Sequence, residues 1–233
     1  MNHYQYILFF SSIIVLVSSA TLGTYKSAII SNPRNGIYDL VGLKAECPYT
    51  GAMKTVQVIY TSSQLYYQMQ CYSSNAASIE YDESVIKVYY ETKTTNYDLC
   101  TDNRFIWLDR HQIACTKDFA LSSFYLEKSG TNCRYTYTCV AVKSTYEDEQ
   151  LKNKASSKLD AKSGAMTGLT TLKIGDAGSN RNALHNFRLQ MDYTKSTWEA
   201  QYYYGIITLR DMAAVKDDYL AKSKKLREEN TEV

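Results

Sequence analysis

The sequence predicts an all-β protein built from three related, disulfide-stapled β-hairpin units, and two observations support this fold class. First, Cys47 and Cys71 have the same separation along the chain as Cys115 and Cys139. Second, apolar and polar residues alternate within each cysteine pair, which is the period of a β-strand. Such a repeat indicates a repeated structural unit. We expect a pseudo-threefold, prism- or barrel-like arrangement, followed by a short C-terminal helix or tail.

The repeated unit occurs in three copies. Each copy has an alanine and an apolar residue, then an apolar strand, a polar tip and a return strand rich in aromatic residues. The matching positions are Ala52-Met53, Val56, Val58, Tyr67 and Met69 in the first copy, Ala120-Leu121, Phe124, Leu126, Tyr135 and Tyr137 in the second, and Ala183-Leu184, Phe187, Leu189, Tyr202 and Tyr204 in the third. The third copy lacks cysteines and has Ile206 at the closing position. We therefore expect apolar burial to close that unit.

The cysteines are expected to form disulfides, because six cysteines in an exported chain favour disulfides over metal ligation. Spacing pairs Cys47 with Cys71 and Cys115 with Cys139, which leaves Cys100 and Cys133 as the third pair. The sequence has no Cys-x-x-C motif, so neither a redox centre nor a zinc site is expected. We predict no cofactor and no metal.

The chain is expected to contain three parts. Residues 1–20 have the features of a signal peptide, with an apolar run from Ile7 to Val17 and small residues at Ser18 and Ala20. An uncleaved anchor is the alternative, but the run is short for a span of about 20 residues. A three-repeat β domain should cover residues 24–210, with units at about 36–71, 104–139 and 172–209. Residues 211–233 should form a charged helical or disordered tail.

Three further segments lie between the repeated hairpins. The runs Ser84–Tyr90 and Arg104–Leu108 are rich in β-branched and aromatic residues, so we expect strands there. The run Ser144–Ser163 is polar and charged, and it predicts a short helix or a disordered insertion.

The cysteine-bounded unit resembles the dermatopontin-like extracellular matrix proteins. The resemblance lies in the opening Cys47-Pro48 and in the closing strand Tyr135-Thr136-Tyr137-Thr138-Cys139. The chain departs from that family because its Asp109-Arg110 precedes an opening cysteine rather than a closing one. The spacing from cysteine to apolar strand is also similar to that of the vitelline membrane outer layer type of β-prism. These resemblances imply a secreted protein of repeated β units.

The composition indicates that exposed aromatic residues, rather than clustered charges, are the candidate binding groups. The net charge of +2 gives no case for nucleic-acid binding, which needs clustered basic residues. Tyrosine, by contrast, is abundant at 22 residues and is favoured at interfaces. Tyr60, Tyr66, Tyr125 and Tyr203 are expected to be out of register with the inward positions and to form a candidate binding surface.

An enzyme would need a positioned base. The only histidines after the predicted signal segment are His111 and His185. His111 is expected to be a surface or hydrogen-bonded strand residue. His185 is expected to be exposed, because Lys54 and Ser122 occupy its place in the other copies. No catalytic motif is present.

We therefore predict a non-enzymatic structural or adhesion protein, secreted to the extracellular space or held in a secretory granule. It would bind a matrix or cell-surface protein or glycan, or itself, with no membrane span after signal cleavage. A lectin-like carbohydrate-binding module is the alternative, and a secreted hydrolase is a third candidate.

Overall fold

The structure is a computed structural model that describes residues 22–34, 36–48, 51–72, 90–101, 104–117, 119–142, 152–155, 159–160, 169–170, 172–175, 178, 182–192 and 199–208. The predicted signal segment, the tail 211–233 and all but the last residue of the run Ser84–Tyr90 lie outside the described residues. The regular structure is almost entirely β, as predicted. Among the described residues there is no helix with the length and hydrophobicity of a transmembrane span.

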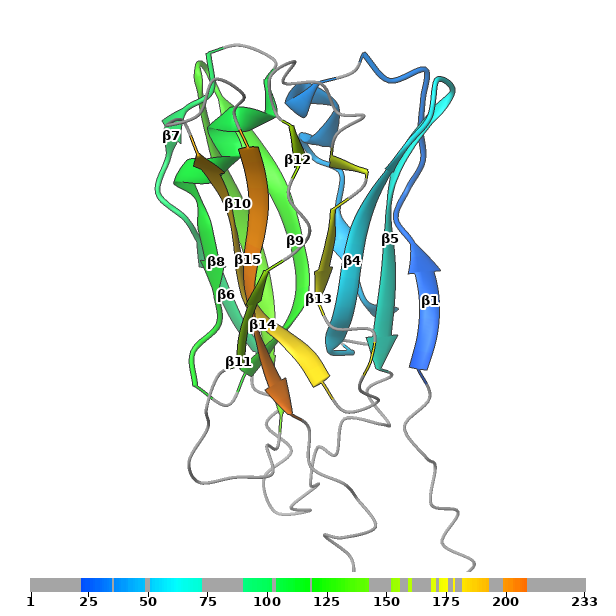
Figure 1. Cartoon of the computed structure of the whole chain (residues 1–233), viewed down its shortest axis with the longest axis vertical. Coiled ribbons are helices and arrows are strands. Elements are labelled where there is room, and N and C mark those ends of the chain that lie inside the picture. The colour runs from blue at the N-terminus through cyan, green and yellow to red at the C-terminus, as the bar shows by residue number, and fades with distance from the viewer. Residues whose placement is uncertain are drawn as a thin grey trace, which may run out of the picture.

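The strands form three five-stranded antiparallel sheets, here named A, B and C. Sheet A contains β1 (Leu22–Lys26), β2 (Ile30–Ser31), β4 (Met53–Tyr60), β5 (Gln64–Tyr72) and β13 (Lys173–Gly175). Sheet B contains β3 (Ala45–Glu46), β6 (Tyr90–Thr94), β7 (Asp98–Leu99), β9 (Phe119–Ser129) and β10 (Asn132–Ala141). Sheet C contains β8 (Gln112–Ala114), β11 (Lys152–Ala155), β12 (Leu159–Asp160), β14 (Asn182–Asp192) and β15 (Glu199–Thr208). The three predicted hairpins, β4–β5, β9–β10 and β14–β15, are the long central strands of these sheets (Figure 1).

The three sheets share one strand plan. The second strand of each hairpin pairs with an edge strand that is broken in two: β1 and β2, β6 and β7, or β11 and β12. The first strand of each hairpin pairs with a short strand that leads into a different hairpin. β3 precedes the hairpin of sheet A but pairs with β9 of sheet B, β8 pairs with β14 of sheet C, and β13 pairs with β4 of sheet A. Each described sheet thus receives a short strand from the segment that leads into another hairpin, and we call this arrangement strand exchange. The order is cyclic, from A to B, from B to C and from C to A, and each sheet remains open.

A β-bulge interrupts the first strand of every hairpin at the same repeat position. The extra residues are Lys54, Ser122 and His185, and all three are buried. The prediction that His185 is exposed was therefore wrong. A bulge breaks the two-residue alternation of a strand and re-aims the side chain. Differing residues at one repeat position thus reflect a special backbone site rather than a solvent-facing one.

Apolar side chains between the sheets form one large core. Its centre is a set of aromatic rings from all three hairpins, packed edge to face, with centroids 5.1–6.3 Å apart: Tyr67, Phe124, Tyr135, Phe187 and Tyr202. A smaller cluster contains the repeated alanines Ala52, Ala120 and Ala183 together with Tyr72, Val140, Val142 and Ile207. Equivalent residues of the three copies therefore meet in the interior.

The six cysteines form Cys47–Cys71, Cys115–Cys139 and Cys100–Cys133, the same pairs that spacing predicts. Cys47 and Cys115 directly follow the exchanged strands β3 and β8, so their disulfides each join two sheets. The backbone N–H groups of these two cysteines donate to the bulge carbonyls of Ser122 (3.0 Å) and His185 (3.1 Å).

The third exchange point closes without a disulfide. Ile206 stands at the closing position, opposite Leu184, and is buried. On β13, Gly175 has φ +100°, and a Cβ there would collide with the Lys54 carbonyl. Glycine is therefore required where this leading strand passes the bulge. Burial and a close backbone approach replace the covalent link at this junction.

Two segment predictions were wrong. Phe105–Arg110 is a 3-10 helix, η3, rather than a strand, and it occupies the same place in its unit as η1 (Ile37–Leu40). A short apolar run does not by itself separate strand from helix. The run Ser144–Ser163 contains the edge strands β11 and β12, which pair with β15. Its polar composition had suggested no strand.

Candidate functional site: a polar groove between two sheets

A polar groove of about 370 Å³ lies where the edge of sheet B faces the edge of sheet C. One wall is the β6–β7 segment, and the other is the end of η3 with β8, seen on the left of Figure 1. The lining side chains are Thr94, Thr95, Asn96, Asp98, Arg110, Gln112 and Tyr137. Its volume is within the range of about 300–1,000 Å³ that is typical of small-molecule sites.

An ion pair crosses the groove at one end. Arg110 Nη1 donates to Asp98 Oδ1 at 2.8 Å, and the backbone N–H of Leu99 donates to the same oxygen at 2.7 Å. The hydrogen bond from Arg110 holds the pKa of Asp98 below its ordinary value. Arg110 also lies over the Trp107 ring, 4.7 Å from its centroid, which restricts the guanidinium further. The groove therefore presents an oriented carboxylate and guanidinium with no net charge between them.

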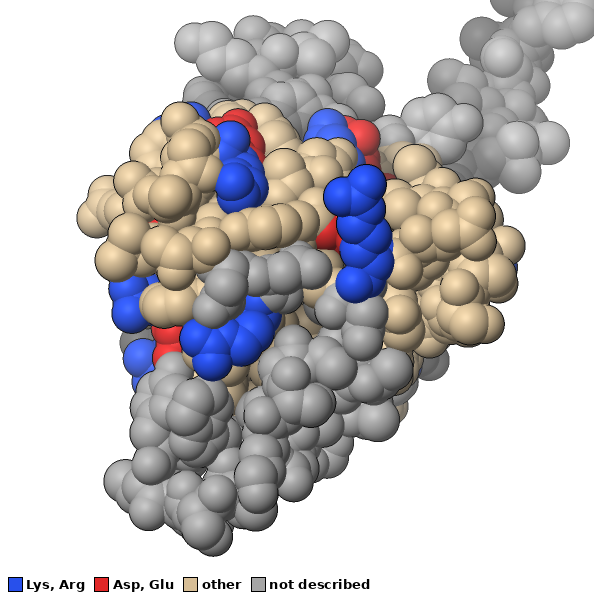
Figure 2. Space-filling model, turned by 90° about the horizontal axis from the view of Figure 1, so that it is seen from above, with Lys and Arg blue, Asp and Glu red and all other residues tan. Residues whose placement is uncertain are grey.

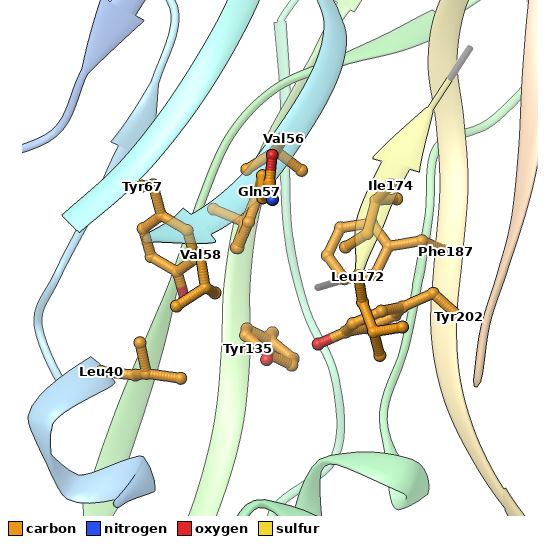
Figure 3. A pocket seen from close by; sticks show the side chains of 11 residues that line it. Leu40, Val56, Gln57, Val58, Tyr67, Tyr135, Leu172, Ile174, Phe187 and Tyr202 are labelled. Carbon is orange, nitrogen blue, oxygen red and sulfur yellow. The ribbon is translucent and has the colours of Figure 1, made fainter. Parts of the chain in front are cut away.

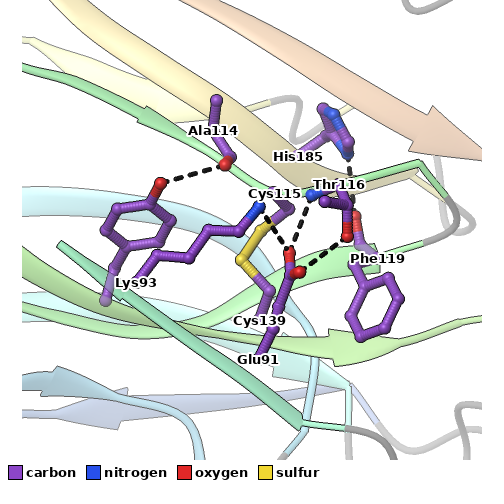
Figure 4. A network of polar contacts seen from close by, with 9 residues as sticks. Glu91, Lys93, Ala114, Cys115, Thr116, Phe119, Cys139 and His185 are labelled. Carbon is purple, nitrogen blue, oxygen red and sulfur yellow. Dashed lines mark hydrogen bonds and ion pairs between the residues drawn. A yellow bond between two sulfur atoms is a disulfide. The ribbon is translucent and has the colours of Figure 1, made fainter. Parts of the chain in front are cut away.

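Further hydrogen bonds connect the two walls. The Tyr137 hydroxyl donates to the carbonyl of Ala114 at 3.0 Å. Glu91 accepts from both the backbone N–H and the hydroxyl of Thr116, each at 2.7 Å. Figure 4 shows this network beside the Cys115–Cys139 disulfide. Together with the ion pair, these contacts fix the width of the groove.

Glu91 is a structural carboxylate rather than a metal ligand. Partial burial raises its pKa, but hydrogen bonds from Thr116 and the nearby Lys93 ammonium, at 3.2 Å, outweigh that effect and leave the pKa lowered. One of its carboxylate oxygens lies within 4.8 Å of the sulfurs of Cys115 and Cys139. Those sulfurs are bonded to each other, and metal ligation would require thiolates. The cluster therefore fits a hydrogen-bonded support of the groove.

His111 contacts the groove residue Thr95 from the interior and is only 3% exposed. Its Nδ1 is 3.2 Å from the Thr95 hydroxyl, and its ring packs edge to face against Tyr135 with centroids 5.9 Å apart. Its Nε2 has no hydrogen-bond partner within the described part of the chain. Burial lowers the pKa of the imidazole, so the neutral form is favoured. The hydrogen-bonded position was predicted, but the surface or strand location was wrong, because His111 follows η3 in the interior.

The repeat shows that the fold does not require these polar residues. The backbone N–H groups of Leu43, His111 and Leu172 donate to Leu40, Leu108 and Leu169 respectively, so the three residues occupy one repeat position. Leucine stands there in two units and histidine in one. Two groove positions can be compared in the same way. Asp98 of the second unit corresponds to Ile30 of the first unit, and Tyr137 corresponds to Met69. Asp98 and His111 are thus polar where the first unit has apolar residues, whereas the tyrosine at the Tyr137 position recurs in the third unit as Tyr204.

The predicted tyrosine surface is not continuous. Tyr60 lies on the inward side of β4 and packs against the core, so its predicted outward register was wrong. Tyr66, Tyr125 and Tyr203 face outward, but they belong to sheets A, B and C respectively. Each contacts a charged neighbour: Lys26 over the Tyr66 ring, Glu127 bonded to the Tyr125 hydroxyl, and Arg188 over the Tyr203 ring.

The second histidine belongs to a different environment. His185 Nδ1 lies 2.8 Å from the carbonyl of Phe119, and the residue sits in the bulge of β14. His185 is not among the residues that line the groove. The described part of the chain shows no contact between His185 and His111. The structure therefore does not bring the two candidate bases together.

Sequence reasoning missed the groove residues Asp98, Arg110 and Gln112. One signal was present, because alignment of the repeats places His111 against Leu43 and Leu172. No signal indicated the pairing of Asp98 with Arg110, which depends on strand exchange.

Figure 2 shows the end of the molecule that carries η1, η3 and hairpin tips. Lysine and arginine side chains appear there as separate patches, several with acidic side chains beside them. This distribution gives no continuous basic field for a polyanion.

No protein-family model, curated protein or solved structure matches the chain.

Proposed function

We propose that the protein is a secreted, non-enzymatic binding protein whose polar groove takes a neutral carbohydrate. The observation that carries this proposal is the polar lining of the groove, together with Asp98 and the underlying His111 where the first unit has Ile30 and Leu43. Buried polar groups cost stability unless they are well paired. Residues that break the local packing rule without structural need are typical of functional sites.

The donors and acceptors of the groove suit a ligand with hydroxyl groups. Asp98 accepts hydrogen bonds, Arg110 donates them, and the amides of Asn96 and Gln112 do both. Sugar hydroxyls also donate and accept, so one ring can satisfy several of these groups together. An anionic ligand is less well matched, because the guanidinium is already paired with Asp98.

Hydrolysis is less well supported than binding. Glycoside hydrolysis ordinarily uses two carboxyl groups flanking the scissile bond, whereas Asp98 is the single carboxylate that lines the described groove. His111 lies beneath the lining and its Nδ1 contacts Thr95. If glycosidase activity were found and were lost in His111→Ala, the hydrolase alternative would replace this proposal.

The setting of the groove supports an extracellular role. Three disulfides are typical of proteins in oxidising compartments, and the predicted signal at residues 1–20 agrees with export. We further propose that the three sheets form a pseudo-threefold prism, a proposal supported by their common strand plan and cyclic exchange. Binding of a matrix or cell-surface glycan would give the adhesion role that the sequence suggests.

A glycan array tests the proposal, with the disulfide-intact protein as the probe. We expect saturable binding to neutral glycans that free sugar competes away. Asp98→Asn and Gln112→Ala should each weaken binding about tenfold, as expected when one hydrogen-bonding partner of a bound ligand is lost. Lys44→Ala is the matched control, because Lys44 holds the position of Gln112 in the first unit.

An array without binding would contradict the carbohydrate proposal. Sedimentation and pull-down from matrix extracts would then test self-association and protein partners. Binding that survives both groove substitutions would place the site elsewhere on the surface.

A further inference from the structure

The strand β1 forms an open edge of sheet A. The backbone of Leu22–Lys26 pairs with β5, and within the described residues it makes no backbone hydrogen bond to any other segment. Figure 1 shows β1 as the outermost strand on its side of the molecule. An edge strand presents a row of unpaired N–H and C=O groups, which can pair with a further strand. β1 is therefore available for strand addition.

The other edge of sheet A offers much less for pairing. It is formed by β13, which is three residues long and pairs with β4. Figure 3 shows Leu172, just before this strand, and Ile174 within it directed into the core, where they line a small cavity with Phe187. Burial holds this short strand in place, so β1 is the long free edge of the sheet.

The equivalent edge strands of the other two sheets have charged residues at two positions where β1 has none. The matching residues are Glu91 and Lys93 in β6, Lys152 and Lys154 in β11, and Gly23 and Tyr25 in β1. The single charged residue of β1, Lys26, is at the end of the strand. Natural proteins use charged residues, lysine above all, to prevent edge strands from pairing with another chain. Of these three strands, β1 alone lacks that protection.

Glu91 also connects β6 to the neighbouring sheet, and β1 has no such connection. The Glu91 carboxylate accepts two hydrogen bonds from Thr116, which lies just beyond β8. At the corresponding place in β1, a Cβ on Gly23 would collide with the Tyr25 hydroxyl, so the Tyr25 side chain lies against its own strand. No hydrogen bond joins the described residues of β1 to sheet B.

We propose that β1 pairs antiparallel with β1 of a second copy of this chain, so that two copies of sheet A form one continuous sheet across a two-fold axis at Thr24. Such an interface uses the same residues on both copies. The register is self-complementary, with these opposed pairs: Thr24 with Thr24, Gly23 with Tyr25, and Leu22 with Lys26. Leu22 is 40% exposed in the single chain and packs here against the aliphatic stem of Lys26.

Charge complementarity favours this pairing for β1 and opposes it for β11. No like charges face each other across the β1 pair, whereas the same arrangement of β11 sets Lys152 opposite Lys154, which is destabilising. A pairing of five residues buries little surface, so the dimer is weak, with a Kd on the order of 100 µM. The inference is independent of the proposed carbohydrate groove, which lies between sheets B and C.

Sedimentation equilibrium of the disulfide-intact protein, at about 1 µM to 1 mM, tests the proposal. We expect a monomer–dimer equilibrium in the wild type. Thr24→Lys should raise the Kd about tenfold, because two lysines then face each other at the axis. Thr92→Lys is the matched control, since Thr92 holds the same position on β6 and its substitution should leave the Kd unchanged. Mixing the Thr24→Lys and Thr24→Glu proteins should restore the dimer, because opposite charges then meet.

A monomeric wild type, an unchanged dimer in Thr24→Lys, or an equal loss in Thr92→Lys would each overturn the proposal. If Thr24→Lys fails to fold, the smaller substitution Thr24→Cys decides. All native cysteines are paired, so the new thiol is the single free one. Residues opposed across two paired strands are close enough for a disulfide, so air oxidation should give a covalent dimer that a reductant dissociates. Thr92→Cys should stay monomeric, and the absence of a Thr24→Cys dimer would overturn the proposal.

Discussion

The groove junction of β6, η3 and β8 and its counterpart of β1, η1 and β3 share one strand plan but differ in side-chain chemistry. Both are closed by a disulfide of the same sequence separation, 24 residues. At three equivalent positions the counterpart has Ile30, Leu43 and Met69, and the groove junction has Asp98, His111 and Tyr137. The backbone of this junction is therefore compatible with apolar side chains. The strand plan therefore does not require Asp98 and His111.

The disulfides should produce the largest effect and should not distinguish the two junctions. We expect Cys115→Ala with Cys139→Ala to lower the free energy of unfolding by about 3 kcal/mol, since a loop of this length is freed in the unfolded chain. The double substitution of Cys47 and Cys71 should cost the same within about 1 kcal/mol. Urea unfolding of both variants measures this. A much larger loss at the groove junction would show that its polar contacts depend on the disulfide.

Exchanging residues between the junctions should produce the next largest effect. We expect Leu43→His to lower the free energy of unfolding by about 2–3 kcal/mol, because it removes apolar contacts and buries a polar imidazole in the core. His111→Leu should raise it by about 1 kcal/mol, because Nε2 is no longer buried without a partner. Denaturant titration at pH 7.5 gives both values. A destabilised His111→Leu protein would mean that the histidine is a structural requirement of this junction.

The hairpins and the disulfides were predictable from the sequence because both produce local patterns. Alternation marks a strand, and equal cysteine spacing marks a repeat. The strand exchange was not predictable, since β3, β8 and β13 are only two or three residues long and pair with distant segments. Asp98 and Arg110 meet only through that exchange. The burial of His185 was missed because a bulge has no signature in a pattern of period two.

The pH dependence of stability should also separate the two junctions. Burial lowers the pKa of His111, which is partly opposed by Asp98 and Asp109 and reinforced by Arg110. As pH decreases, the unfolded chain therefore binds a proton at a higher pH than the folded protein does. The contribution of neutral His111 to stability is fully present above the ordinary pKa of 6.5 and is lost as pH falls through the pKa of the folded protein. Unfolding at several pH values between about 7.5 and 5 should show this slope in the wild type. His111→Leu should have a flatter profile there, and an equally steep one would assign the slope to other groups.

The smallest effect concerns Glu91, whose place in the first unit is taken by Gly23. Glu91→Gln keeps the shape of the side chain but removes the charge that accepts two bonds from Thr116 and pairs with Lys93. We expect a loss of less than about 1 kcal/mol, because the pair is partly solvated. The hydrogen bonds lower the pKa of Glu91, so its contribution is present above the ordinary value of 4.5 and disappears as pH falls through the folded value. At pH 7 the variant should therefore be slightly less stable than the wild type, and the difference should vanish in acid.

Because Glu91 supports the wall that carries β8, the variant should also loosen the groove and weaken glycan binding more than Lys44→Ala does. Equal binding in the two variants would show that the ion pair of Asp98 and Arg110 sets the groove width without help from Glu91.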